Sequence, residues 1–205
     1  MNKLLLKFLM LSSITIVSCV SAFASWVQWG GNGHWYSFHA TGGPVTWQDA
    51  NAAAQSEGGY LATLTSAEEN SFGYSLVSHW SLAPGHPDGW GGPWLGGFKK
   101  DGQWGAWVTG EAWSFTDWNS SLNNQEPNNV GGHEDFLMLV NKNQGVNSVG
   151  TWNDFVAEGD NRPIGGELYV DSYLIERDTQ PVPEPGCLAA VGLVAALTRY
   201  FRRTP

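Results

Sequence analysis

Cysteine is nearly absent from this sequence of 205 residues: it occurs as Cys19 and Cys187, and none lies between them. The long segment between these two positions therefore cannot be stabilised by internal disulfides. The sequence also lacks a pair of neighbouring cysteines, a Gly-x-Ser-x-Gly motif and a Walker loop. It therefore does not predict the nucleophilic or phosphate-binding sites that such motifs indicate.

Positive charge is scarce as well. Nineteen Asp and Glu residues lie between Asp49 and Glu184, against five Lys and Arg residues in the same segment, so the formal charge of that segment is −14. A surface this acidic repels nucleic acid and anionic lipid, and it is better suited to cations and neutral sugars. We therefore expect no nucleic-acid partner.

The titratable residues do not predict an enzyme. His34 and His39 have no nucleophile close by in the sequence, and the other histidines are isolated: His79, His86 and His133. Two acidic pairs are the alternative basis for a hydrolase, Glu68–Glu69 and Glu134–Asp135. The first pair fits the first turn of a helix and the second fits metal binding, so we expect no catalytic residues.

The N-terminal segment has the composition of a targeting signal. Residues 1–24 combine Lys3 and Lys7 with an apolar run and the sequence Ala22-Phe23-Ala24. This pattern is typical of a secretory signal peptide, here cleaved before Ser25. The alternative is a buried N-terminal helix, which the small residues at the cleavage position disfavour.

The C-terminal segment, residues 181–205, contains Pro183-Glu184-Pro185, an apolar run from Cys187 to Leu197 and three arginines. The run is short for a permanent transmembrane helix, and the arginines would stay on the cytoplasmic side. The combination resembles the PEP-CTERM sorting signal of Gram-negative bacteria. That resemblance implies cleavage by an exosortase-type membrane protease and a transient contact with the membrane; the alternative is a plain C-terminal anchor.

Residues 25–180 predict one α+β domain with two helices and mainly antiparallel sheets. Thr46 is expected to cap the first helix, which Gly58-Gly59 ends. Ser66 is expected to cap the second, whose buried face is assigned to residues one turn apart: Phe72, Leu76 and Trp80.

Short strands are expected at residues 35–39 (an edge strand), 60–64, 94–97, 104–108, 136–140, 151–155 and 168–175. Two segments are predicted as loops because of their Gly, Pro and Asn content, residues 84–93 and 110–134. Loops as long as the second are usually functional or mobile.

The end of that long loop is rich in oxygen-bearing side chains. The run Gln125-Glu126-Pro127-Asn128-Asn129-Val130-Gly131-Gly132-His133-Glu134-Asp135 is followed after a short segment by Trp152-Asn153-Asp154. Carboxylate and amide oxygens are the ligands that Ca²⁺ prefers. A softer metal needs Cys or His ligands, and this run contains only His133. Five side chains therefore offer oxygens that suit calcium: Glu126, Asn128, Glu134, Asn153 and Asp154. The alternative is a polar surface loop followed by an Asx turn.

The same residues resemble the sugar-binding calcium site of C-type lectins, in which Glu-Pro-Asn, a later glutamate and Trp-Asn-Asp occur in this order. Further markers extend the resemblance from about Gly33 to Arg177: Gly58-Gly59-Tyr60-Leu61-Ala62, Trp94-Leu95-Gly96-Gly97 and Trp107-Val108-Thr109-Gly110-Glu111. The resemblance implies a C-type lectin-like fold, with the long loop lying across its top. It also implies Ca²⁺ bound by the five side chains and by the Asp154 carbonyl, with two adjacent sugar hydroxyls as further ligands.

The resemblance carries finer expectations. It implies a cis Glu126–Pro127 bond, and it implies mannose-type specificity, because Glu-Pro-Asn accompanies mannose-type sugars and Gln-Pro-Asp accompanies galactose. A second calcium site is disfavoured, because Asn129 replaces an acidic ligand, Lys99-Lys100 adds positive charge, and Asp135 alone is not sufficient.

This chain also departs from the family, which usually has two disulfides. The expected cysteine positions are apolar here, and we expect burial to replace the crosslinks: Ala54, Ile175, Phe136 and Ala157. Four tryptophans match structural positions of the family: Trp47, Trp94, Trp107 and Trp152.

Two functions are compatible with these features. The first is a calcium-dependent carbohydrate-binding protein, exported and sorted to the cell surface or exopolysaccharide matrix of a Gram-negative bacterium. The second is a calcium-stabilised protein-interaction or matrix protein of the same fold that binds no sugar. The completeness of the ligand set favours the first.

Overall fold

The structure is a computed structural model that describes residues 26–77, 92–121, 124–140, 150–157 and 170–181. Residues Val27–Thr179 form one compact unit. The predicted signal peptide, the tail beyond residue 181 and most of the predicted loop 84–93 lie outside the described residues, as do Trp80, Trp90, His79 and His86. Within the described ranges, no helix is long and apolar enough to cross a membrane.

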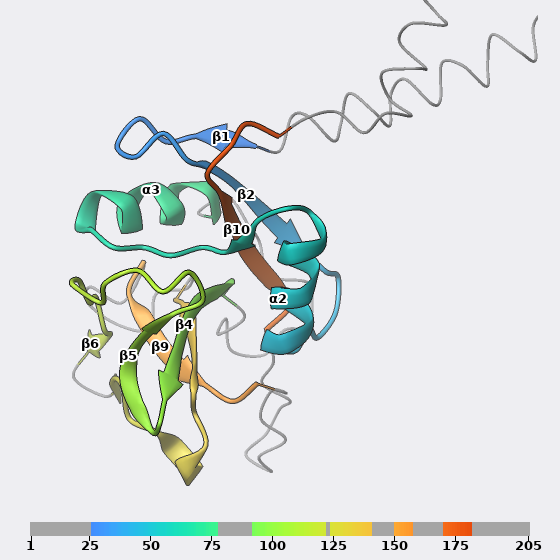
Figure 1. The fold of residues 1–205 in the computed structure, drawn as a ribbon. Helices are drawn as coiled ribbons and strands as arrows, with labels where there is room; N and C mark the ends of the chain where they lie inside the picture. The colour runs from blue at the N-terminus through green and yellow to red at the C-terminus, as the bar shows by residue number, and fades with distance from the viewer. Residues whose placement is uncertain (1–25, 78–91, 122–123, 141–149, 158–169, 182–205) are drawn as a thin grey trace, which may run out of the picture. The chain divides into compact units, whose positions relative to one another are not determined.

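A single twisted sheet forms the framework of the domain (Figure 1). Its main path runs through β1 (Val27–Gln28), β2 (Trp35–Ala40), β10 (Ser172–Arg177), β4 (Trp94–Lys100), β8 (Phe136–Leu139) and β9 (Trp152–Phe155). Two further strands pair beside this path, β3 (Tyr60–Leu61) with β10 and β5 (Gln103–Trp107) with β4. The two-residue strands β6 (Ser120–Ser121) and β7 (Asn124–Gln125) form a separate ladder in the long loop.

The α+β class is confirmed, but the sheet is mixed rather than wholly antiparallel. Strands β10 and β4 pair in parallel at Tyr173 and Trp94, where the N-terminal and C-terminal parts of the sheet join. The assignment of residues 35–39 to an edge strand was wrong, because β2 pairs with β10 on one side and with β1 on the other. Strand β3 is shorter than predicted, and β10 begins later and continues to Arg177.

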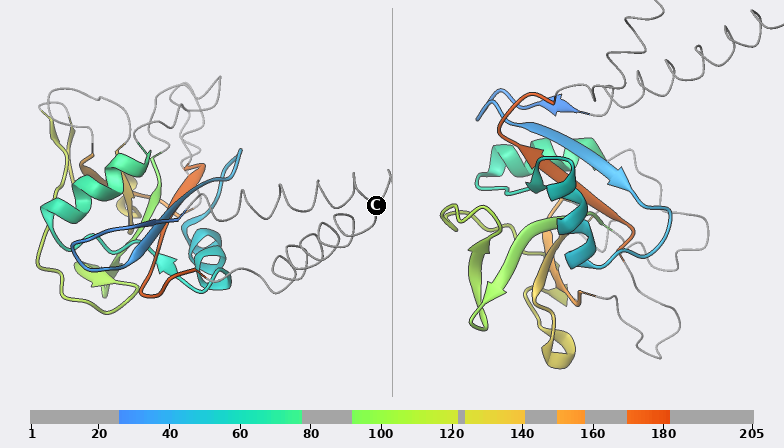
Figure 2. Two further views of the ribbon diagram at one scale, coloured as in Figure 1. Left: turned by 90° about the horizontal axis from the view of Figure 1, so that it is seen from above. Right: turned by 45° about the vertical axis from the view of Figure 1, so that its right-hand side comes forward.

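The first helix, α2 (Trp47–Ser56), forms as its sequence predicts. The Thr46 hydroxyl accepts a hydrogen bond from the Asp49 amide at 3.0 Å and so satisfies a donor of the first turn. Trp47, Ala50 and Ala54 are buried on one face of α2, and the helix lies beside the sheet (Figure 2). The chain leaves the helix through Gly58, whose φ of +75° is the left-handed conformation that glycine adopts without strain.

The second helix, α3 (Ala67–Val77), is capped by Ser66 as predicted, but its buried face differs. The buried residues are Glu69, Asn70, Gly73 and Val77, whereas Phe72 and Leu76 flank this face and are partly buried. A β-carbon at Gly73 would lie 3.2 Å from side-chain atoms of both Leu64 and Leu174. The glycine therefore lets the helix lie close to the sheet, and polar neighbours share the interface.

The core confirms the assignment of four tryptophans to packing: Trp47, Trp94, Trp107 and Trp152 are all buried. Two positions where the family has cysteine, Ala54 and Ile175, are fully buried as expected. The other two, Phe136 and Ala157, are only partly buried, although the Phe136 ring packs on Trp47 with centroids 4.6 Å apart. Apolar side chains thus stand where the family has disulfides, and they are more fully buried at Ala54 and Ile175 than at Phe136 and Ala157.

Candidate functional site

The five predicted ligands come from two kinds of structure. Asn153 and Asp154 lie on β9, which pairs with β8 over four residues. The other three lie in the loop after β7, which includes the short 3₁₀ turn η1 (Val130–Gly132): Glu126, Asn128 and Glu134. The loop is therefore placed beside a strand whose position the sheet fixes.

The Asp154 carboxylate connects the strand to the loop. One of its oxygens accepts from the Asn128 amide and the other from the Asn129 amide, both at 3.0 Å. Glu126 Oε2 also accepts from the Asn128 amide, at 3.1 Å. Glu134 Oε2 accepts from the Val130 amide at 2.6 Å. The loop backbone thus folds around three carboxylates, and the predicted side chains lie together.

The site concentrates negative charge away from solvent. Asp154 is 0% exposed, Glu134 3% and Glu126 9%. Burial, reinforced by the adjacent Asp154 carboxylate and by Glu134, raises the pKa of Glu126 to about 8. Carboxylates this close remain charged together at neutral pH only if positive charge offsets their repulsion.

Two buried oxygens at the site lack donors. Within the described residues, Glu126 Oε1 and Asn153 Oδ1 are buried and have no hydrogen-bond partner. Unpaired buried acceptors are costly, roughly 1–3 kcal/mol each. The candidate side chains at the site offer carboxylate and amide oxygens and no sulfur. Such hard ligands fit a cation such as Ca²⁺ and not a soft metal.

Carboxylates alone would not hold an ion here. In the part of the chain that the structure describes, no three His, Cys, Asp or Glu side chains are arranged as a metal site. Calcium at this place would therefore need amide and carbonyl oxygens too, which Asn128, Asn153 and the Asp154 carbonyl could supply. The Asp154 carbonyl presently accepts from Asn153 Nδ2 at 2.6 Å, so it is occupied by its neighbour.

One further expectation is confirmed next to the site. The Glu126–Pro127 peptide bond is cis, as predicted. Asp135 pairs with Lys99 at 3.3 Å, and Asn129 Oδ1 accepts from the Glu134 amide at 3.1 Å. Both groups of the disfavoured second calcium site therefore have protein partners.

The sequence did not indicate two residues that hold the loop through backbone contacts, Asn119 and Trp118. Asn119 is fully buried, and its carbonyl accepts from the Glu126 amide at 2.8 Å. Trp118 forms an isolated β-bridge with Trp152, the residue that precedes Asn153. No motif marks Asn119, because its role depends on a backbone group and not on its side-chain type.

The comparisons with known proteins bear on the fold. No protein-family model matches the chain. A perlucin-like protein of Mytilus galloprovincialis is 32% identical over 117 residues, which are 56% of this chain and 64% of that protein. The match thus spans less than two thirds of the relative's length.

Solved structures match over most of the described domain. The C-type carbohydrate-recognition domain of cow CD23, crystallised with GlcNAc2Man3 oligosaccharide, aligns with a TM-score of 0.52 and 23% identity over 76% of this chain and 95% of that one. The chain has the C-type lectin-like fold. SPL-1, in a complex with GlcNAc, aligns with a TM-score of 0.53 and 22% identity over 76% and 94% of the two chains. A calcium-independent type II antifreeze protein also shares the C-type lectin-like fold, with a TM-score of 0.51 and 18% identity over 75% and 92%.

Proposed function

We propose that this domain is a calcium-dependent carbohydrate-binding module. The observation that carries the proposal is the pair of donorless buried oxygens, Glu126 Oε1 and Asn153 Oδ1, within a cluster of three buried carboxylates. Solved structures of the same fold include complexes with an oligosaccharide and with GlcNAc, which supports a glycan as ligand. Calcium would be held by Glu126, Asn128, Glu134, Asn153 and Asp154, and it would supply a Lewis-acidic centre for sugar hydroxyls.

The protein's own side chains would recognise the sugar by matching donors and acceptors. A hydroxyl can donate one proton and accept another, so a carboxylate beside an amide satisfies both of its roles. Glu126 with Asn128 forms one such pair, and Glu134 with Asn153 forms the second. We propose a mannose-type sugar because this order of acid and amide in Glu-Pro-Asn accompanies equatorial 3- and 4-hydroxyls in C-type lectins.

We further propose that the protein is not an enzyme. The clustered carboxylates are committed to backbone donors in the loop, as in the bonds of Asp154 to Asn128 and Asn129. We also propose that the chain is exported, sorted and trimmed by an exosortase-type protease. This rests on the composition of residues 1–24 and 181–205, and it would place the domain at the surface of a Gram-negative bacterium.

A glycan array with the purified protein tests the binding function. We expect binding to mannose-type glycans in calcium and loss of that binding in chelator. Glu126→Gln should lose the signal, whereas Glu111→Gln, the same change at an exposed residue outside the five proposed ligands, should keep it. Binding that persists in chelator at full strength would contradict calcium dependence.

The second candidate is a calcium-stabilised interaction or matrix protein. The shared fold of a calcium-independent antifreeze protein supports it, because it shows that the scaffold occurs with a different function. This candidate predicts calcium-dependent stability together with an array that shows no glycan binding under either condition.

A further inference from the structure

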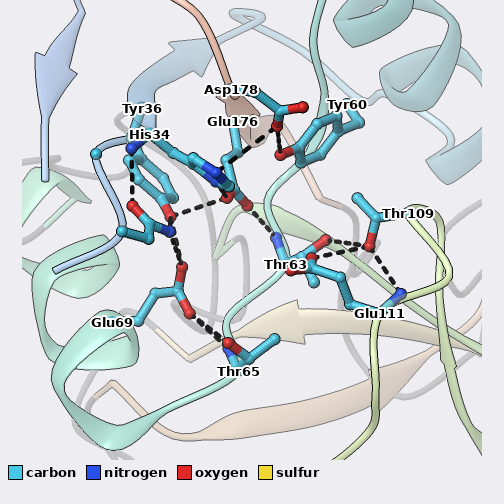
Figure 3. Close-up of polar contacts among 12 residues, drawn as sticks. His34, Tyr36, Tyr60, Thr63, Thr65, Glu69, Thr109, Glu111, Glu176 and Asp178 are labelled. Atoms are coloured by element: carbon cyan, nitrogen blue, oxygen red, sulfur yellow. Dashed lines mark hydrogen bonds and ion pairs between the residues drawn. The ribbon is translucent and has the colours of Figure 1, made fainter.

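A second cluster of buried polar side chains joins β2, α3 and β10 (Figure 3). Tyr36 of β2 lies between Glu69 of α3 and Glu176 of β10, and the two glutamates are 2% and 1% exposed. In Figure 1 and in the right-hand view of Figure 2, β2 and α3 lie at the opposite end of the domain from the yellow segment around residue 130. The cluster is therefore separate from the proposed calcium site.

The two glutamates converge on one hydroxyl. Tyr36 Oη lies 2.5 Å from Glu69 Oε1 and 2.9 Å from Glu176 Oε1. The same Oη accepts a hydrogen bond from Asn32 Nδ2 at 2.9 Å. A tyrosine hydroxyl carries one proton, so it can donate to only one of the two carboxylates. The other contact between oxygens becomes a hydrogen bond only if the carboxyl itself carries a proton.

The remaining oxygens of both glutamates are held by fixed donors. Glu69 Oε2 accepts from the amide and the hydroxyl of Thr65, at 2.7 and 2.9 Å. Glu176 Oε2 accepts from the Thr63 amide at 2.8 Å. These bonds prevent the carboxyl groups from rotating away from the hydroxyl when charge accumulates. Repulsion between the two carboxylates would therefore push apart α3, which carries Glu69, and β10, which carries Glu176.

His34 connects the cluster to solvent. Its Nδ1 lies 2.6 Å from Glu176 Oε1, and the side chain is 25% exposed. His34 also lines an open pocket of about 400 Å³ together with Tyr60, Thr109, Glu111 and Asp178. Protons can therefore reach the buried cluster through the imidazole.

The charged groups around the cluster favour retention of a proton. Asp178 follows β10 and accepts from the Tyr60 hydroxyl of β3 at 2.5 Å, and Glu111 follows β5 on the far side of the pocket. Glu68 of α3 is exposed, and the short β1 has no titratable residue. Arg177 is the nearest cation in sequence, but its guanidinium donates to the Glu57 carbonyl at the end of α2.

We propose that Glu69, Tyr36 and Glu176 form a pH-sensitive clasp that holds one proton beyond the tyrosine's own, exchanged with solvent through His34. While this proton is present, both contacts of Tyr36 Oη are hydrogen bonds and β2 is fastened to α3 and β10. When it is lost, two carboxylates face one hydroxyl proton, and the attachment of β2 weakens.

The pKa directions agree with the geometry. Burial raises the pKa of Glu176 to about 7, although the hydrogen bonds from His34 and Thr63 lower it. Burial lowers the pKa of His34, but the hydrogen bond and charge of Glu176 and the charges of Asp178 and Glu111 outweigh it, and the pKa is raised. Both groups bind protons more tightly in the folded state, so their stabilisation is complete below the ordinary carboxyl pKa and is lost as pH rises through about 7.

Hydrogen exchange and thermal unfolding of the intact protein in chelator test the clasp. Between pH 5 and pH 8 we expect Tm to fall by about 5 °C. After correction for intrinsic exchange rates, protection of β2 and of the first turn of α3 should fall about tenfold more than that of β8 and β9. Glu176→Gln should remove this excess loss of protection in β2 and α3, because the amide supplies the second donor at every pH. Asp101→Asn, the same loss of charge in the exposed turn between β4 and β5, should keep this excess.

A spectroscopic measurement detects the shared proton directly. The infrared difference spectrum between the wild type and Glu176→Gln should contain the carbonyl band of a protonated carboxylic acid at pH 6 and lose it near pH 8, because Glu126, whose pKa is also raised, contributes equally to both proteins and cancels. A spectrum without that band at pH 6 would overturn the clasp, as would equal loss of protection in all strands with rising pH.

Discussion

Replacing Asp154 with alanine is the sharpest test of the proposed calcium site. Asp154 is fully buried on β9 and is the group through which the strand holds the loop, because its two oxygens accept the Asn128 and Asn129 amides at 3.0 Å each. Alanine removes both acceptors and one negative charge. The substitution therefore affects two properties, the order of the loop and the affinity for calcium, and each can be measured separately.

The stability that Asp154→Ala loses in the absence of calcium follows from these two hydrogen bonds. Two amides lose a charged acceptor, and one such loss costs about 1.5–3 kcal/mol when the amide stays buried. Two effects reduce the sum: the loop can turn its amides toward water, and the repulsion that contributes to the raised pKa of Glu126 is relieved. We therefore expect a loss of about 1–3 kcal/mol in the free energy of unfolding.

Calcium should reveal the second effect. The wild-type domain is expected to bind Ca²⁺ with a Kd of about 10⁻⁴–10⁻³ M, as extracellular modules do. Asp154→Ala should abolish the binding signal in calorimetry, and the stabilisation of the wild type by calcium in urea titrations should disappear. Asp154→Asn retains one acceptor oxygen, so it should recover part of the apo stability without restoring calcium binding.

Asp135→Ala is the matched control. Asp135 follows Glu134 directly but is half exposed and pairs with Lys99, a contact worth about 0–1 kcal/mol. Its removal should leave calcium affinity unchanged. Equal calcium binding by Asp154→Ala and wild type would refute the site assignment. Lost binding with unchanged apo stability would show instead that the carboxylate does not hold the loop.

Three further outcomes are expected. Chelation should raise hydrogen exchange in residues 110–135 and leave the helices protected, because the loop has few apolar anchors; uniform loss of protection would contradict this. Mass spectrometry of native protein should find the chain ending near Pro185, whereas an intact Pro205 in surface-extracted material would favour an anchor. Combining Glu126→Gln with Asn128→Asp should hold calcium affinity within about tenfold and weaken the mannose preference in glycan binding; an unchanged mannose-to-galactose ratio would place the sugar surface elsewhere.

Local chemistry explains what the sequence could predict of the helices. The Thr46 cap and the buried positions Trp47, Ala50 and Ala54 depend on neighbours within one or two turns, and all are found as expected. The buried face of α3 depends instead on distant partners. Glu69 bonds to Tyr36, and Asn70 accepts from Trp152 Nε1 at 2.8 Å. Apolar periodicity cannot identify buried polar residues, because their partners are remote in the sequence.

The candidate site shows the same division. The sequence singles out five candidate side chains, because Glu-Pro-Asn and Trp-Asn-Asp form a recognisable pattern, and their role as ligands stays a prediction. The hydrogen bonds that organise the loop could not be predicted, because most involve backbone amides, such as those of Asn129 and Val130. The support from the Asn119 carbonyl has no side-chain signature either.

The arrangement couples ion binding to loop order. Asn153 and Asp154 are fixed by the pairing of β9 with β8, whereas Glu126 and Asn128 lie on a loop with little regular structure. The Asp154 carboxylate that would bind the cation also accepts the amides that order this loop. Stronger contact with a cation draws electron density from those hydrogen bonds, while the cation removes the repulsion between the carboxylates. The net effect of calcium on loop order is therefore set by charge compensation more than by new hydrogen bonds. Glu126→Gln removes one of the repelling charges and leaves the Asp154 acceptors in place, so it should partly mimic the ion's effect on loop order without allowing sugar to bind.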